Sequence, residues 1–187
     1  MLLRCLPQVR LRRATGLRSL PALHYGDRMV PRGRSRRATT PVVATGPSSD
    51  DTHEIVYFRR HRDDDPLEST PGRDALGSFP TKVRATMRAV LVAVAAAPPK
   101  RFAGGGYWEA MHGEMTGWFE VRVDGPRRTH HRLFCLLDYS AGDREKPLLV
   151  IVDGRSKPFR TTLAASDYRE VRKLGDEYRS RTPRSVL

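Results

Sequence analysis

The sequence contains few of the residues that mark a disulfide framework, a membrane span or a metal centre. Its 187 residues include two cysteines, Cys5 and Cys135, a usage typical of a reduced, cytoplasmic protein with a buried thiol. The longest apolar run, residues 89–97, falls far short of the roughly 20 residues that a transmembrane helix needs. The neighbouring His130 and His131 lack the spacing of zinc ligands, and we interpret them as surface residues. We therefore expect no metal, no cofactor and no membrane partner.

Acidic residues are almost missing from the first 49 positions, which hold ten arginines and a single acid, Asp27. This segment carries +9 of the net charge of +13, while the other residues, with 24 basic and 20 acidic side chains, carry +4. It shows no sustained helical or strand period. We expect residues 1–50 to be a disordered Arg-rich extension and residues 51–187 to form the folded domain. A mitochondrial transit peptide, or a start codon assigned too early with Met29 as a later start, are the alternatives.

From residue 52 onward the pattern becomes that of an α+β domain. Apolar runs at strand spacing and stripes at helical spacing predict, in chain order, a strand over 55–58, a helix over 80–97, strands over 118–123, 131–137 and 148–152, and a helix over 164–179. Residues 100–117 are expected to form a glycine-rich loop, and residues 181–187 to fray. Gly175 lies inside the last helix, where glycine costs about 1 kcal/mol relative to alanine. The fold class that we predict is a small mixed or antiparallel sheet packed on helices.

Two of the predicted strands carry arginines on the face opposite their apolar residues. Side chains alternate between the two faces of a strand. The core face therefore receives the apolar set Phe119, Val121, Val123, Leu133, Cys135 and Leu137. Glu120, Arg122, Arg132 and Phe134 project from the other face, and we expect Arg122 and Arg132 to lie close together on it. A sheet face that displays a carboxylate among arginines is a suitable pocket for a phosphodiester.

The order and spacing of three runs resemble a known family. The runs are Phe119-Glu120-Val121-Arg122-Val123, then Arg132-Leu133-Phe134, then Val150-Ile151-Val152-Asp153-Gly154 with Lys157-Pro158. Together they resemble the RelE/HigB toxin superfamily, most closely its phage-like HigB branch, and residues 167–178 resemble the family's closing helix. The resemblance covers about residues 52–180. Residues 158–162 depart from it, because relatives often have more lysines there, as does the long polar stretch 139–147.

The resemblance implies the toxin component of a type II toxin–antitoxin system. Such a protein would be a small α+β endoribonuclease, an mRNA interferase that inhibits translation by cutting messenger RNA, usually on the ribosome. Its implied partners are messenger RNA, the ribosome and a helix-turn-helix, HigA-like antitoxin, with operator DNA reached only through the antitoxin complex. The implied chemistry needs no metal: the ribose 2′-OH attacks the adjacent phosphate, leaving a cyclic phosphate and a free 5′-OH.

Such a reaction needs a proton acceptor and cations where charge develops. Arg122 and Arg132 are our candidates for gripping one phosphate in bidentate fashion. Glu120, on the same face, is the candidate base, although a lysine such as Lys157 could serve instead. Salt bridges from the arginines to Glu120 and Asp153, or plain solvation, are the structural alternative.

Further residues are predicted to contact RNA around this centre. Arg155, Lys157 and Arg160 would line the rim and meet flanking phosphates or ribosomal RNA. Phe134 could stack on a base or equally fill a gap under a loop. Tyr178 could also stack on a base, but its helical spacing with Tyr168, Val171 and Leu174 favours packing on the sheet. A non-catalytic nucleic-acid-binding or antitoxin-binding module acting in operon autoregulation remains the alternative function, because it would keep the same basic face.

Overall fold

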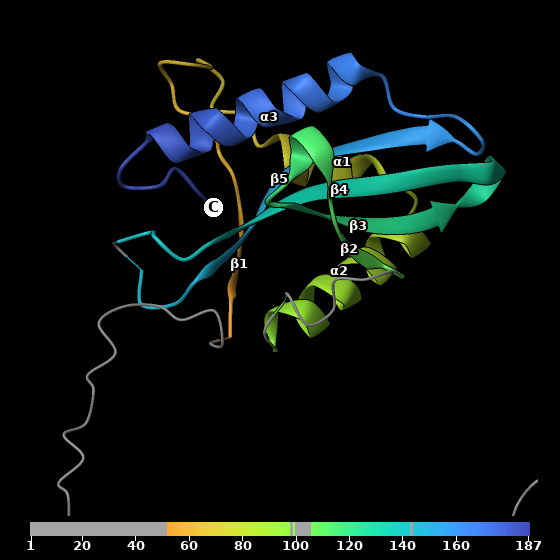
Figure 1. The fold of residues 1–187 in the computed structure, drawn as a ribbon, viewed down its shortest axis with the longest axis horizontal. Coiled ribbons are helices and arrows are strands. Elements are labelled where there is room, and N and C mark those ends of the chain that lie inside the picture. Colours follow the sequence, from red (N-terminus) through yellow and green to blue (C-terminus); the bar gives the residue numbers. More distant parts are fainter. Residues whose placement is uncertain (1–51, 98, 100–105, 143) are drawn as a thin grey trace, which may run out of the picture. The chain divides into compact units, whose positions relative to one another are not determined.

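A mixed five-stranded sheet is the central layer of the structure, a computed structural model that describes residues 52–97, 99, 106–142 and 144–187 (Figure 1). Its strands are β1 Glu54–Tyr57, β2 Trp108–Ala110, β3 Trp118–Gly125, β4 Thr129–Asp138 and β5 Leu148–Pro158. Their spatial order is β1-β5-β4-β3-β2, with β1 parallel to β5 and the other neighbours antiparallel. The prediction for residues 1–50 falls outside the described residues.

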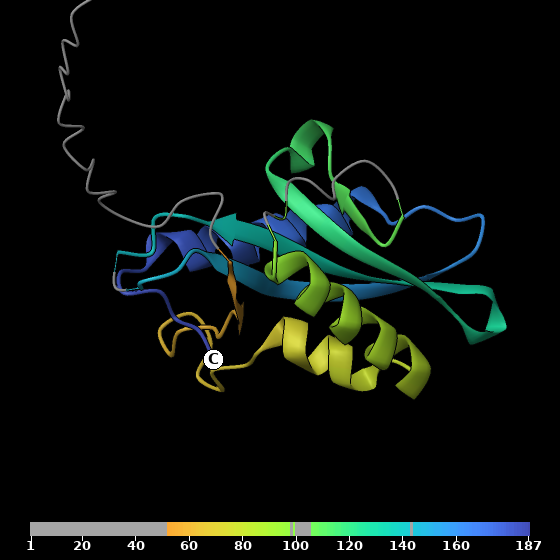
Figure 2. The ribbon, with the colours of Figure 1, turned by 90° about the horizontal axis from the view of Figure 1, so that it is seen from below.

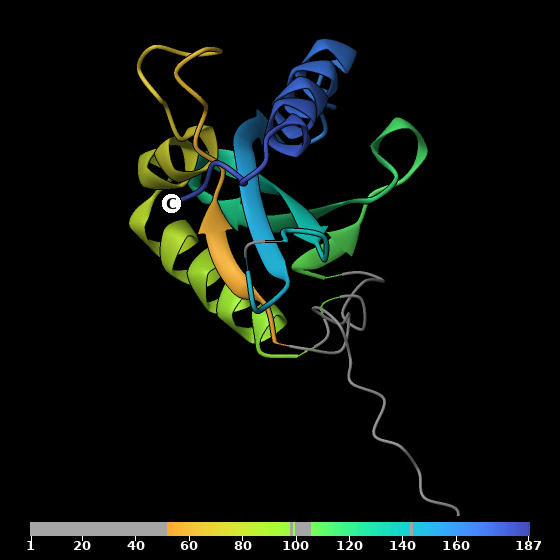
Figure 3. The same ribbon diagram turned by 90° about the vertical axis from the view of Figure 1, so that its left-hand side faces the viewer.

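Helices cover both faces of this sheet. Helices α1, Pro71–Ser78, and α2, Thr81–Ala95, pack on one face, and α3, Ala165–Ser180, lies along the other. Figure 2 shows α1 and α2 in front of the sheet, and Figure 3 shows them on the side of the sheet opposite α3. The predicted α+β class, with a mixed sheet packed on helices, is therefore confirmed. No helix in the described part of the chain is long and apolar enough to cross a membrane.

The alternation predicted for β3 and β4 sorts their residues into two cores. Phe119, Val121, Leu133 and Cys135 pack under α1 and α2 in the first core, with Met87 at its centre. The second core lies under α3 and contains Trp118, Phe134, Leu136, Val150, Val171 and Tyr178. A two-residue period therefore decides which of the two cores each apolar residue of these strands joins, and it leaves Glu120, Arg122 and Arg132 on the α3 side.

Gly175 lies inside α3 where another residue would not fit. A Cβ atom at this position would lie 2.4 Å from the Trp118 ring, so the close approach of helix and sheet requires glycine. The helix continues through it from Ala165 to Ser180. Tight packing on β3 thus offsets the intrinsic cost of glycine in a helix.

Two predictions about irregular segments are wrong. The expected loop over 100–117 contains β2, whose three residues pair with β3 through Trp108, opposite Val121. Residues 181–187 were expected to fray, but the Leu187 N–H and C=O exchange two 2.9 Å hydrogen bonds with Tyr57, at the outer edge of β1. The Arg59 N–H also donates to the Ser185 carbonyl at 3.1 Å. This segment caps the edge of the sheet.

Candidate functional site

Three strands align their charged residues in rows on the α3 face of the sheet. Arg122 on β3 lies opposite Arg132 on β4, which in turn lies opposite Arg155 on β5. The prediction that Arg122 and Arg132 share a face and are neighbours is therefore confirmed. We call this set the arginine row. Like charges directly opposite each other destabilise a sheet unless they are compensated, so the row needs counter-charges.

A β-bulge brings Arg155 into this row. Phe134 pairs with Asp153 but Cys135 pairs with Ile151, so Val152 is an extra residue in β5. Gly154 then faces the first core, where its hypothetical Cβ would meet Ala75 and Leu133. Because neighbours alternate, Asp153, Arg155 and Lys157 face the α3 side. The predicted strand ended at residue 152, with the basic residues after it. The strand in fact runs to Pro158 and includes Arg155 and Lys157.

Buried carboxylates supply the counter-charges. Glu120 is only 4% exposed; its Oε2 accepts a hydrogen bond from Arg132 at 2.7 Å, and its Oε1 lies 3.7 Å from Arg122 Nη1. Glu109, the cross-strand neighbour of Glu120 on β2, pairs with Arg122 at 2.9 Å. Glu120 and Glu109 thereby fix the guanidinium groups of Arg122 and Arg132.

Arg155 is held in the same way. Its Nε donates to Asp153 at 2.9 Å, and its Nη2 donates to Glu170 of α3 at 3.0 Å. Burial raises the pKa of Asp153, and the neighbouring positive charge of Arg155 opposes that rise. The salt-bridge alternative from the sequence therefore describes part of this surface, since each arginine of the row has a carboxylate partner.

A second row lies one step nearer the hairpin tip. Asp124 on β3 lies opposite His130 on β4, and His130 lies opposite Lys157 on β5. Asp124 Oδ1 and His130 Nδ1 are 2.5 Å apart. The Lys157 ammonium donates to the Thr161 carbonyl. The pKa of Lys157 is lowered by burial and then by repulsion from Arg132 and Arg122, so its ammonium lies within electrostatic reach of the arginine row.

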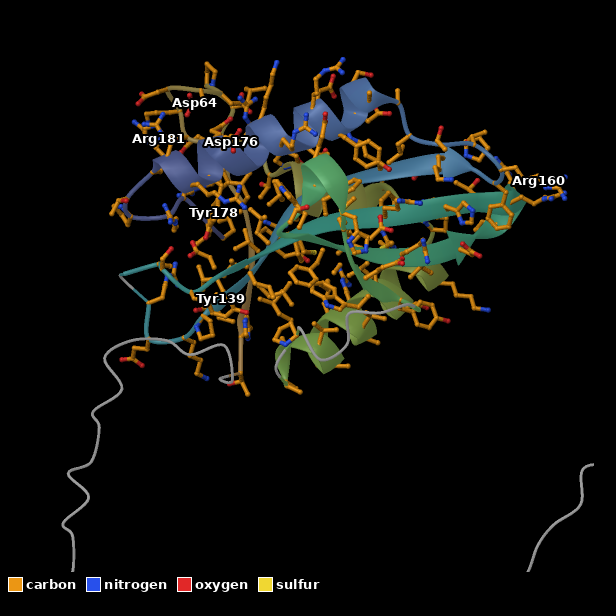
Figure 4. The ribbon with its side chains drawn as sticks, in the orientation of Figure 1. Asp64, Tyr139, Arg160, Asp176, Tyr178 and Arg181 are labelled. Atoms are coloured by element: carbon orange, nitrogen blue, oxygen red, sulfur yellow. The ribbon has the colours of Figure 1, made fainter. Side chains whose placement is uncertain are left out.

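The tip beyond these rows is strongly basic. Arg127, Arg128 and Arg160 are exposed and adopt φ values of 56°, 55° and 61°, a left-handed conformation that is uncommon for residues other than glycine. The Phe159 N–H donates to the Arg128 carbonyl at 2.8 Å, joining the β3–β4 turn to the segment after β5. Figure 4 labels Arg160 at this end of the molecule.

Two predicted stacking residues lie elsewhere. Phe134 is fully buried and packs edge-on against Tyr168 of α3, with ring centroids 6.2 Å apart. Tyr178 is 1% exposed, and its hydroxyl donates to Asp138 at 2.8 Å. Figure 4 shows Tyr178 at the end of the molecule opposite Arg160. Neither ring presents a free face to a base, so the packing alternative holds for both.

Three residues outside the predicted site help to build it: Glu109, Glu170 and His130, which we interpreted only as a surface residue. The alternation that placed Arg132 also puts His130 on its face, two residues earlier, so the sequence contained that signal. Glu109 and Glu170 join the site through contacts with distant segments, so no sequence pattern indicated them. His131, interpreted as a surface residue, is buried: its ring packs 4.8 Å from that of Phe79, and burial lowers its pKa.

The arrangement is suited to binding an anion and moving a proton. Arg122 is 36% exposed, so part of its fork of donors faces solvent above the buried carboxylate. Among the described residues, no group of three or more His, Cys, Asp or Glu side chains could hold a metal ion. The face therefore offers guanidinium donors, an imidazole and an ammonium within three adjacent strands.

No family model, no curated protein and no solved structure matches this chain.

Proposed function

We propose that this chain is a metal-free endoribonuclease of the RelE/HigB type, the messenger-RNA-cleaving toxin of a type II toxin–antitoxin system. The observation that carries the proposal is the arginine row, in which Arg122 and Arg132 lie side by side on one sheet face. Its support from the sequence is the order of the three strand motifs described above. The α+β fold with a sheet packed on helices is consistent with the small toxin fold that the resemblance implies.

The row fits the demands of cleavage through the 2′-OH. The phosphate gains negative charge in the transition state, and fixed donors that await it stabilise that charge without reorganising. Arg122 and Arg132 are preorganised in this sense, because Glu120 and Glu109 fix their guanidinium groups. An Arg fork matches two phosphate oxygens at once.

The structure changes the role that we propose for Glu120. Its side chain is buried and bonded to Arg132, so it orients the phosphate-binding groups and has little access to a ribose hydroxyl. Arg155 is engaged on both sides by carboxylates. Lys157 and the exposed tip arginines, including Arg160, are left to contact flanking phosphates or ribosomal RNA.

A non-catalytic nucleic-acid-binding or antitoxin-binding module is the second candidate. The pairing of every arginine in the row with a carboxylate favours it, because surfaces evolved only for binding keep their charges compensated as well. The two candidates differ in turnover. A binding module would leave transcripts intact at any expression level.

Controlled expression of the full chain distinguishes them. We expect induction without an antitoxin to arrest growth and to produce transcripts with new 5′-OH ends, which end mapping detects. Arg132→Lys keeps the charge next to Glu120 but loses the fork, and we expect it to reduce cleavage by about 100-fold. Arg88→Ala, an exposed arginine of α2 on the other face of the sheet, is the matched control and should cleave like wild type.

Thermal unfolding of each purified variant verifies that the protein is folded. Intact transcripts in cells that accumulate folded wild-type protein would overturn the nuclease proposal and favour the binding module. Equal cleavage by wild type and Arg132→Lys would show that the arginine row is not the catalytic centre.

A further inference from the structure

The Asp124–His130–Lys157 row contains groups that the proposed phosphate site does not use. Each of the three residues lies one alternation step from the arginine row on its own strand: Asp124 from Arg122, His130 from Arg132, and Lys157 from Arg155. Two residues along a strand span about 6.6 Å. A phosphate held over the arginine row would therefore place its neighbouring ribose and leaving oxygen within reach of this second row.

Contacts around the imidazole define which nitrogen is available. A carboxylate only accepts hydrogen bonds, so the 2.5 Å contact assigns the hydrogen of the neutral ring to Nδ1 and leaves the lone pair on Nε2. His130 Nε2 makes no hydrogen bond to any residue that the structure describes. The ring is stacked on Phe159, with centroids 4.1 Å apart and planes 19° apart, which fixes its orientation. Its side chain is 24% exposed, so a ligand can approach.

We propose that His130, oriented by Asp124, is the general base of the cleavage reaction, and that Lys157 is the general acid. This inference rests on the proposed function and replaces Glu120 as the proton acceptor. The exposure of Glu120 and of His130 decides which of them is the better candidate for the base. The Glu120 carboxylate is buried beneath two arginines, whereas the His130 ring is partly exposed and is oriented by Asp124 and Phe159.

The proton balance of the step is complete. His130 Nε2 takes the proton of the 2′-OH as its oxygen forms a bond to phosphorus. The bond from phosphorus to the 5′ oxygen breaks, and Lys157 Nζ donates a proton to that oxygen, giving a 2′,3′-cyclic phosphate and a free 5′-OH. The imidazolium and the neutral amine then exchange one proton through solvent, which restores the starting state. No oxidant, reductant or metal enters the step.

The charged groups around His130 are consistent with these roles. Asp124 and Lys157 flank it on the neighbouring strands, and Arg132 lies two residues along β4. Arg128 lies over the Phe159 ring, its guanidinium carbon 6.0 Å from the centroid. Asp124 stabilises the imidazolium that forms during the step, while the cations favour return of the proton. The lowered pKa of Lys157 makes its ammonium a better proton donor.

Single-turnover cleavage of messenger RNA on purified ribosomes between pH 5.5 and 8.5 tests the proposal. Wild type should lose rate as the pH falls, because a protonated imidazole accepts no proton. His130→Gln should lower the rate about 100-fold to 10,000-fold and should abolish the loss of rate at low pH, the acidic limb of the pH profile. Asp124→Asn should lower the rate less and displace the limb. His61→Gln is the matched control, since His61 also pairs with an aspartate, Asp63, at 3.1 Å, in the loop between β1 and α1.

A modified substrate separates the acid from the base. Replacing the bridging 5′ oxygen by sulfur gives a leaving group that needs no protonation, so Lys157→Ala should regain wild-type rate on this RNA and His130→Gln should not. Binding of an RNA with a 2′-deoxyribose at the scissile position should be equal for wild type and His130→Gln, which establishes that the variant is folded.

Each result has one meaning. A wild-type rate and an unchanged pH profile for His130→Gln overturn the inference while leaving the nuclease proposal intact. A lower rate with the acidic limb retained assigns His130 a structural role and also overturns the inference. If wild type itself cuts no RNA under any condition, the proposed function fails, and this inference fails with it.

Discussion

The two ends of the sheet each place a buried carboxylate next to an arginine, with opposite results. At one end Asp138 accepts hydrogen bonds from the Ser140 N–H and hydroxyl at 2.8 Å, from Tyr178 at 2.8 Å and from Arg184 at 2.9 Å. Arg184 Nη1 donates to the carbonyls of Arg179 and Arg181. At the other end, Glu120 also accepts from an arginine, but the neighbouring Arg122 remains partly exposed.

The difference teaches how to separate a structural network from a binding site. Around Asp138 donors and acceptors are matched inside the protein, and the network fastens the C-terminal segment to the end of β4. On the arginine row the Arg132 Nε is buried without an acceptor, and the Arg122 side chain is 36% exposed. Residue types alone do not distinguish these cases; the balance of donors and their exposure does.

The largest effect that we expect is on stability at the Asp138 end. Asp138→Ala removes the acceptor of the Tyr178 hydroxyl and of Arg184 Nε and leaves these two donors unpaired inside the protein. The free energy of unfolding should fall by about 3 kcal/mol, measured by urea denaturation. Cleavage per folded molecule should stay unchanged, and a loss of rate in fully folded protein would break the comparison between the two ends.

The same carboxylate makes stability depend on pH. Burial raises the pKa of Asp138, but hydrogen bonds from Ser140, Tyr178 and Arg184 outweigh burial and lower it from 3.8 to about 2. Because the pKa is lower in the folded state, this stabilisation is complete above about pH 4 and is lost as the pH falls toward 2. It amounts to about 2 kcal/mol. Denaturation at pH 5 and pH 2.5 should show the loss in wild type and a smaller loss in Asp138→Asn.

At the other end the expected loss is in activity. Arg122→Ala removes a phosphate donor whose side chain is one-third exposed, so the free energy of unfolding should change by no more than about 1 kcal/mol. Cleavage should fall about 100-fold. Arg184→Ala is the paired control, since it should lower stability and leave the rate per folded molecule intact. Equal behaviour of the two variants would contradict the distinction that we draw.

The smallest effect concerns RNA binding by Lys157, measured apart from its proposed role as the general acid. Lys157→Ala removes one cation near the RNA backbone, so the slope of log binding constant against log salt should become shallower by about one unit. Arg88→Ala, on α2 at the other face of the sheet, provides the control and should leave the slope unchanged. Titration of a non-cleavable RNA between 50 and 200 mM salt measures both.

Strand periodicity predicted the part of the site that lies within regular strands. Arg122 and Arg132 could be placed on one face because the side chains of β3 and β4 alternate regularly between the two faces of the sheet. The same period would have put His130 on that face. Helical spacing likewise predicted that Tyr178 faces the sheet, and the packing role that follows is the one the structure shows.

The sequence could not predict what depends on contacts between distant segments. Glu120 looks exposed by alternation, yet it is buried, with Arg132 bonded to its carboxylate and Glu109 of β2 beside it. The strand β2 is three residues long, too short to produce a periodic signal, and it is defined by its pairing with β3. Glu109 enters the site only through that pairing.

Val152, the extra residue at the β5 bulge, sets the parity of the rest of its strand. If the bulge were lost and Val152 paired in a regular ladder, strict alternation would turn Asp153, Arg155 and Lys157 toward α1, where Gly154 now lies against Ala75. The bulge thus separates a strand whose second half directs its charges to the α3 face from one that would bury them in an apolar layer.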